Sequence, residues 1–227
     1  SVDNVGAARR LFAASRPIAG TLAETYLRRR GIPISPGLDA LRFHPRCFYR
    51  EDERGPPMRL PALVAAVTDL AGRQTGAQRT WLAPTGRGKA RVATPRRAMG
   101  ELLGHGVRFG QAGEVLAVGE GIETVLSVRA ALPGLPMLAA LSAGHLAAVR
   151  FPEALRRLYV VVDRDPAGEA AVEALSARGS SAGIEVVVLA PVRGDFNDDL
   201  RAFGVGALRE AVRAQLRPKD AERFLGQ

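Results

Sequence analysis

Acidic residues follow three separate apolar runs of this sequence, and carboxylates in such places can hold a metal ion. The groups are Glu120 after residues 115–119, Asp163 and Asp165 after residues 158–162, and Asp195 after residues 185–189. Mg²⁺ is usually bound through one or two carboxylates together with waters and substrate phosphates. Because α/β sheets bind their ligands at the carboxyl ends of the strands, the pattern predicts a magnesium site that serves phosphodiester chemistry.

Asp163 and Asp165 are separated by one residue directly after an apolar strand. Alternation along an extended chain sends residues i and i+2 to the same side, so both carboxylates can reach one ion. Two like charges this close are costly without a cation between them. Asp165 alone can instead begin a turn with Pro166 and cap the next helix, but the pair together favours a metal site.

Glu120 lies between two glycines, which allow a tight turn and a close approach of a metal or phosphate to the backbone. Packing does not readily explain a carboxylate at this position. In the third acidic group we expect Asp195 to be a metal ligand, and Asn197 and Asp198 to support the ligands or to cap a helix that begins near Leu200.

Regular alternation of apolar runs with helical segments supplies the elements that must position these residues. Strands are expected at 115–118, 137–141, 158–162 and 185–189, and helices at 123–131, 146–149, 169–177 and 207–216. Continuous apolar strands that alternate with helices are typical of a parallel sheet with helices on both faces. We therefore predict an α/β domain over residues 113–227.

The N-terminal part has a different pattern, typical of an α+β basic subdomain over residues 1–112. Helices are expected at 5–14 and 21–30, and short strands at 41–43, 62–70, 78–82 and 91–94. Basic residues on and between the strands could track a nucleic-acid backbone together with Trp81, and the alternative is a solvated sheet face. These basic residues include Arg79, Lys89, Arg91, Arg96 and Arg97.

Composition limits the class of protein. The chain has 227 residues, 47% of them hydrophobic, and a net charge of +9 from 32 Lys and Arg against 23 Asp and Glu. Such an excess favours a polyanionic partner such as nucleic acid, although a GC-rich coding sequence also produces an arginine bias. The single cysteine, Cys47, excludes an internal disulfide and a Cys-rich zinc ribbon. No apolar run is long enough to span a bilayer, so a cytoplasmic location is expected.

The ordered set of acidic motifs resembles the Toprim domain of DnaG-type primases, type IA and type II topoisomerases and related nucleases. The resemblance covers about residues 113 to 200 and rests on Gly119-Glu120-Gly121, Asp163-Arg164-Asp165 and Gly194-Asp195-Phe196-Asn197-Asp198. These motifs look most like the Toprim primases of phages, plasmids and conjugative elements. Upstream, Gly88-Lys89-Ala90 and Thr94-Pro95-Arg96 are similar to the segment that precedes Toprim in such primases.

The resemblance implies a primase core that makes short RNA primers on single-stranded DNA. It implies that Glu120, Asp163 and Asp165 hold Mg²⁺ or Mn²⁺, and that the basic residues named above bind template or nucleoside triphosphate. A replicative helicase is a possible partner. The Cys/His zinc ribbon of DnaG-like primases is missing from this sequence. Two alternatives stay open, a Toprim nuclease that uses the same acids and a non-catalytic DNA-binding module.

Overall fold

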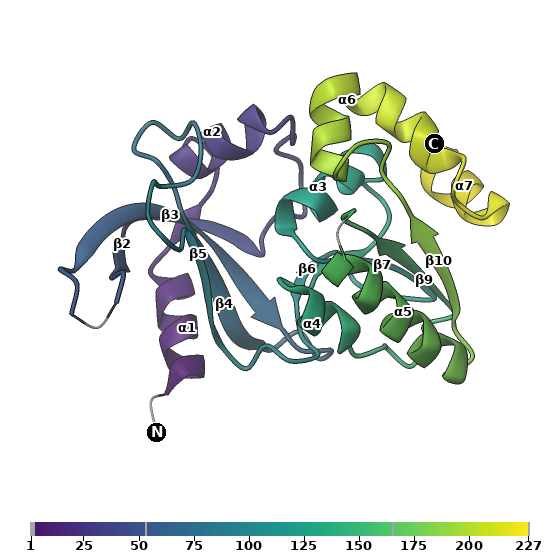
Figure 1. Cartoon of the computed structure of the whole chain (residues 1–227), viewed down its shortest axis with the longest axis horizontal. Helices are drawn as coiled ribbons and strands as arrows, with labels where there is room; N and C mark the ends of the chain where they lie inside the picture. Colours follow the sequence, from purple (N-terminus) through teal and green to yellow (C-terminus); the bar gives the residue numbers. More distant parts are fainter. Residues whose placement is uncertain (1–2, 53, 165, 227) are drawn as a thin grey trace. The chain divides into compact units, whose positions relative to one another are not determined.

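The computed structural model describes residues 3–52, 54–164 and 166–226, so Asp165 lies outside the described residues. The chain divides into two compact units (Figure 1). The first unit comprises Ser1–Arg29 and Pro33–Leu102, and the second comprises Arg30–Ile32 and Leu103–Gln227. A short N-terminal segment is therefore part of the second unit. None of the described helices is long and apolar enough to cross a membrane.

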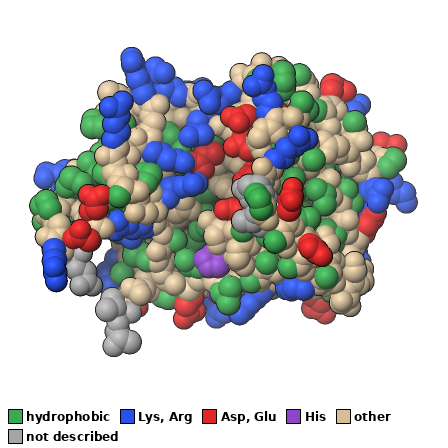
Figure 2. Space-filling view, in the orientation of Figure 1, with side chains coloured by type: hydrophobic (Ala, Val, Ile, Leu, Met, Phe, Trp, Pro, Cys, Tyr) green, Lys and Arg blue, Asp and Glu red, His purple; other side chains and the backbone are tan. Residues whose placement is uncertain are grey.

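The first unit is an antiparallel sheet with two helices. Its strands follow one another in the order β1 (Arg16–Pro17), β2 (Leu41–Tyr49), β3 (Met58–Thr68), β4 (Gln74–Trp81) and β5 (Arg96–Gly100). The helices are α1 (Asn4–Ala13) and α2 (Leu22–Arg29), close to the spans expected from the sequence. This unit has the α+β class expected of the basic subdomain, although it ends at Leu102 and not at residue 112 and leaves out Arg30–Ile32. Basic side chains gather on it around α2 in the view of Figure 2.

Helix α1 packs on the sheet face that carries the apolar core of the first unit. Trp81 is 1% exposed and meets the Tyr49 ring edge-on at a centroid distance of 4.8 Å. Burial raises the pKa of the Cys47 thiol in the same cluster. Since the indole of Trp81 belongs to the core, it cannot stack on a nucleic-acid base, contrary to one expectation from the sequence.

The prediction of a strand at residues 91–94 is wrong, because β5 begins only at Arg96. The alternation around Val92 is typical of a strand, but the strand that pairs with β4 is β5, which lies later in the chain. The Trp81 amide donates to the Pro95 carbonyl over 2.9 Å, and the pairing of β4 with β5 follows from there. A local pattern could not show where this long-range pairing starts.

The second unit contains the predicted parallel sheet. Its strand order is β10 (Glu185–Leu189), β9 (Arg157–Val161), β7 (Val115–Gly119), β8 (Met137–Ala139) and β6 (Val107–Phe109). The first four strands are parallel, and β6 runs antiparallel to β8 at the edge. The sequence did not indicate β6, since three residues give too short a pattern. The expected α/β fold class is confirmed.

Helices cover both faces of this sheet (Figure 1). They are α3 (Ile122–Ala131), α4 (Ala143–Ala147), α5 (Pro166–Ser181), α6 (Phe196–Arg213) and α7 (Pro218–Leu225). Leu158 and Val160 of β9 pack in an apolar cluster with residues of α4 and α5. Helix α6 is kinked at Gly204, which has a left-handed φ of 80° that favours glycine.

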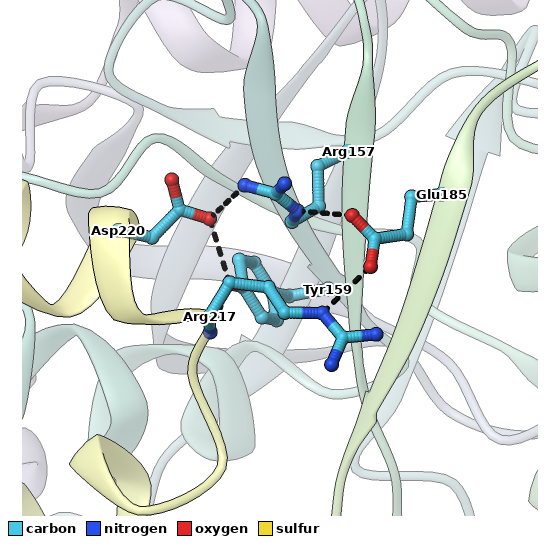
Figure 3. Close-up of polar contacts among 5 residues, drawn as sticks. All are labelled: Arg157, Tyr159, Glu185, Arg217 and Asp220. Carbon is cyan, nitrogen blue, oxygen red and sulfur yellow. Dashed lines mark hydrogen bonds and ion pairs between the residues drawn. The ribbon is translucent and has the colours of Figure 1, made fainter.

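A network of hydrogen bonds and ion pairs joins helix α7 to the amino ends of β9 and β10 (Figure 3). Asp220, which is 4% exposed, accepts hydrogen bonds of 2.7 Å from Arg157 and from the Tyr159 hydroxyl. Glu185 accepts from Arg157 over 2.7 Å and from Arg217 over 2.6 Å. Burial, assisted by the hydrogen bond to Asp220, raises the pKa of Tyr159 to about 12. The sequence did not indicate α7.

Candidate functional site

Glu120 and Asp163 lie at the carboxyl edge of the parallel sheet, on neighbouring strands. Strands β7 and β9 are the central pair, and their register aligns Gly119 with Val161. Glu120 follows β7 by one residue and Asp163 follows β9 by two, and both residues are half-buried. The structure therefore brings these two sequence-predicted residues to the same edge, as the strand order requires.

Gly119 is needed for packing. A Cβ atom built on Gly119 would lie 2.8 Å from Val125 Cγ2 of α3 and 3.2 Å from Val161 Cβ of β9. Any larger residue would force the Val125 side chain or its neighbours to shift. This glycine lets α3 pack close to β7 and so places the first turn of α3 beside the strand ends.

The backbone next to Glu120 contains an unusual conformation. The Leu141 amide donates to the Glu120 carbonyl over 2.8 Å, and Leu141 has a φ of 80°. It is the one non-glycine residue with positive φ in the described part of the chain. Such a conformation is costly for leucine and is often found at functional sites. The turn after β8 is therefore fixed against the residue that we expect to be catalytic.

Thr124, in the first turn of α3, contacts Asp163 directly. The Thr124 hydroxyl Oγ1 donates to Asp163 Oδ1 over 3.1 Å, and Thr124 is 5% exposed. Sequence reasoning did not assign Thr124 a role. The available signal was its position four residues after Glu120, which places it at the helix end that faces the carboxyl edge of the sheet.

Asp195 is the N-cap of α6. Its Oδ1 accepts from the Asp198 amide over 2.7 Å, and the Asp198 side chain is exposed. The expected capping by Asn197 or Asp198 of a helix that begins near Leu200 is wrong, because α6 begins at Phe196 and Asp195 is its cap. Metal coordination by Asp195 stays a prediction, because a carboxylate has a second oxygen.

Asn197 joins three segments of the second unit. Its side-chain amide donates to the Arg30 carbonyl over 2.8 Å and to Ser127 Oγ over 2.9 Å, and its Oδ1 accepts from the Arg30 guanidinium over 3.0 Å. Asn197 is 2% exposed, so these bonds replace water that it cannot reach. These contacts hold α6 against α3, and the expected role of Asn197 in supporting the metal ligands stays a prediction.

Asp199 holds the loop between β10 and α6. It is 2% exposed, and its two carboxylate oxygens accept from the Val192 amide over 2.7 Å and the Arg193 amide over 2.9 Å. Sequence reasoning missed this residue. Its role depends on where the loop folds back, and nothing in the local sequence shows that contact.

The donor set at the sheet edge suits a hard divalent cation. Glu120 and Asp163 offer carboxylate oxygens, and Mg²⁺ needs only one or two of these when phosphates and waters complete its shell. Among residues 3–52, 54–164 and 166–226, no three His, Cys, Asp or Glu side chains form a group that could hold a metal. Asp165, the remaining expected ligand, falls outside those ranges.

Three of the basic residues that the sequence proposed for nucleic-acid binding lie on or near the surface of the first unit. Arg91 and Arg96 are exposed, and Lys89 is half-buried. Lys89 and Arg91 line a cavity of about 680 Å³ that also has apolar residues such as Met58 and Leu60 in its wall. Cationic groups beside an apolar surface suit the phosphates and bases of a nucleotide.

The other two basic residues are used within the first unit. Arg79 stacks over Trp81 at 4.9 Å from the ring centroid, and burial lowers its pKa. Arg97 lies opposite Arg79, stacks over Tyr49 and donates to the carbonyls of Arg50 over 2.6 Å and Glu51 over 2.9 Å. Their structural contacts make Arg79 and Arg97 weaker candidates for nucleic-acid contact than Arg91 and Arg96.

Comparison with protein families also divides the chain into two parts, but the first match extends past Leu102, the end of the first unit, and includes β6. Residues 115–206 match the family described as Toprim domain. Residues 3–109 match a family described as Domain of unknown function (DUF7146). The Toprim match includes Glu120, Asp163 and Asp195, together with the supporting residues Thr124 and Asn197.

Solved primase structures have a similar fold. A DNA primase domain from Pseudomonas aeruginosa aligns with a TM-score of 0.63 at 16% identity, over 98% of this chain and 82% of that one. The Aquifex aeolicus primase structure, which contains zinc binding and RNA polymerase domains, aligns with a TM-score of 0.62 at 17% identity over 92% of this chain. The RNA polymerase domain of Mycobacterium tuberculosis primase DnaG, in complex with double-stranded DNA, gives 0.56 at 21% identity over 92% of this chain and 78% of that one. The present chain spans 60% of the Aquifex chain.

Proposed function

Because residues 115–206 form a Toprim domain and the chain has the fold of DnaG-type primases, we propose that it is the catalytic core of a DNA primase. Such a core is a metal-dependent nucleotidyltransferase that makes short RNA primers on single-stranded DNA. The observation that carries the proposal is the placement of Glu120 and Asp163 at the ends of neighbouring parallel strands. Toprim domains generally bind divalent metals, which agrees with this pair of carboxylates.

In this proposal Glu120, Asp163 and Asp165 hold Mg²⁺ or Mn²⁺, and Asp195 adds a further ligand. A divalent ion held by these residues would supply positive charge beside the triphosphate and the primer 3′-hydroxyl. The chain's own residues keep the carboxylates in place: Gly119 allows α3 to approach, and Asn197 ties α3 to α6.

Arg91, Arg96 and Lys89 would bind the template or the incoming nucleotide through phosphate. The Mycobacterium tuberculosis domain was solved in complex with double-stranded DNA. A solved primase fragment of the bacteriophage T7 primase-helicase protein also has a similar fold, with a TM-score of 0.53 at 14% identity over 89% of this chain and 74% of that one. The proposed primase reaction has single-stranded DNA and nucleoside triphosphates as substrates. The likeness to a primase-helicase protein leads us to propose a replicative helicase as a partner.

The proposal is tested by incubating the chain with single-stranded DNA, labelled ribonucleotides and Mg²⁺ or Mn²⁺, followed by analysis on one gel. Short labelled products that disappear when the metal is chelated are the expected result. Metal-dependent cutting of the template without incorporation would instead identify a Toprim nuclease. Binding to DNA with neither product, unchanged by chelator, would leave only a DNA-binding module.

Charge reversal at Arg91 and Arg96 is expected to weaken binding to single-stranded DNA and to flatten its salt dependence. Both side chains are exposed, so their loss should leave the core intact. Each lost phosphate contact should reduce the slope of log K against log salt by about 0.7 for a single strand. Fluorescence anisotropy at several salt concentrations measures the slope, with Arg54→Glu as an exposed arginine control in the same unit. An unchanged slope in the double variant would remove both residues from the contact surface.

A further inference from the structure

The hydrogen bond between Thr124 and Asp163 links the first turn of α3 to one of the expected metal ligands. Thr124 Oγ1 donates to Asp163 Oδ1 over 3.1 Å. The terminal torsion of an aspartate side chain has a broad and roughly two-fold preference, so the carboxylate plane is not fixed by the rotamer alone. A donor on one oxygen selects one orientation of that plane.

Thr124 is itself held rigidly. It is buried in the first turn of α3, where the Val125 amide donates to the Gly121 carbonyl over 3.0 Å. A β-branched side chain in a helix has few χ1 states, and threonine has two. The position of the hydroxyl is therefore restricted by both the backbone and the side chain of Thr124. Its hydrogen bond can determine the orientation of the Asp163 carboxylate.

One turn further along, α3 is anchored by a second polar contact. Ser127 Oγ donates to the Glu123 carbonyl over 2.7 Å and accepts from the Asn197 side chain over 2.9 Å. Since Ser127 is fully buried, this contact fixes the helix against α6. The position of Thr124 along the strand ends thus depends on two elements of the Toprim domain.

We infer that Thr124 is a positioning residue for Asp163, and that its hydroxyl sets the orientation in which this carboxylate meets the divalent cation. The inference rests on the proposed metal site. A carboxylate has two oxygens and about four lone-pair positions, so accepting one hydroxyl is compatible with cation binding. Metal-binding carboxylates are commonly hydrogen-bonded in this way, and loss of such a partner typically reduces metal affinity 10- to 100-fold.

The test is the affinity of the full chain for Mn²⁺ alone, measured by electron paramagnetic resonance of the free ion. Thr124→Val keeps the shape of the side chain but replaces the hydroxyl with a methyl group, and we expect it to weaken Mn²⁺ binding by about 10- to 100-fold. Thr124→Ser keeps the hydroxyl and should bind within about threefold of the wild type. Thr124→Ala, which has no methyl group to crowd Asp163, carries the same expectation as Thr124→Val.

Ser181→Ala is the matched control, since it removes a hydroxyl that donates to the Ala177 carbonyl near the C-terminal end of α5. It should bind Mn²⁺ like the wild type, and circular dichroism should show every variant folded. If Asp163→Asn abolishes binding but Thr124→Val and Thr124→Ala bind normally, the inference about Thr124 is wrong and the metal site stands. If Asp163→Asn itself binds normally, the proposed metal site is wrong. Failure of Thr124→Ser to restore binding would also contradict the role of the hydroxyl.

Discussion

Asp163→Asn is expected to reduce metal-dependent nucleotide incorporation by about a thousandfold or more while the chain keeps its fold. A bound metal contributes several kcal/mol of transition-state stabilisation, and each 1.36 kcal/mol corresponds to a factor of ten in rate. Asparagine has nearly the same shape and can still accept from the Thr124 hydroxyl, so the local packing should survive. Primer synthesis on single-stranded DNA measures the loss, and thermal unfolding measures the fold.

The control for this variant is Glu173→Gln, which removes one negative charge as Asp163→Asn does. Glu173 is an exposed residue of α5 in the same unit. It should incorporate nucleotides at the wild-type rate, which shows that net charge alone is not responsible. Substantial incorporation by Asp163→Asn, at any Mg²⁺ or Mn²⁺ concentration, would exclude Asp163 from the site. A variant that no longer unfolds cooperatively would point to a structural role.

The sequence predicted the parallel sheet because its strands are continuous apolar runs separated by helical segments. Their order along the chain then implied that Glu120 and Asp163 would follow strands of one sheet, and the structure places them on neighbours. This inference needs only local patterns and the rule that such strands are parallel. It did not need knowledge of any side-chain contact.

Residues whose roles depend on contacts between distant segments could not be predicted in the same way. In the sequence, Thr124 and Asp199 look like ordinary residues of a first helical turn. Their roles come from contacts with Asp163 and with the 190–194 loop, which only the folded chain shows. The segment Arg30–Ile32 joins the second unit through Asn197, a partner 167 positions away from Arg30. Capping by Asp195 is local, but the sequence analysis expected the cap at Asn197 or Asp198, because it placed the start of the helix near Leu200 and not at Phe196.

The C-terminal helix is the element that the sequence analysis missed most completely, and its anchoring can be tested. Asp220→Ala is expected to lower the free energy of unfolding by about 2–3 kcal/mol. Breaking a buried ion pair typically costs 3–5 kcal/mol, and the loss should be smaller here because the Arg157 side chain is 25% exposed. For a chain of this size the change corresponds to a melting temperature lower by roughly 4–12 °C.

Tyr159 provides a second measurement on the same contact. Its pKa is raised in the folded state to about 12, by burial first and by Asp220 second. A raised phenol pKa adds stability that is complete below about pH 10, the unfolded value, and is lost as pH rises toward 12. In Asp220→Ala the part due to the hydrogen bond disappears, so stability should fall less steeply over this alkaline range than in the wild type.

Glu222→Ala is the matched control, because Glu222 is an exposed acid on the same helix. It should melt within about 1 °C of the wild type, since exposed charges contribute little. An equal fall in melting temperature in the two variants would mean that the stability of α7 depends on its net charge or helix propensity and not on the network. A wild-type melting temperature in Asp220→Ala would show that the apolar contacts of α7, such as those of buried Leu225, hold it without the network. The expected difference arises because only Asp220 is a buried acceptor for both Arg157 and Tyr159.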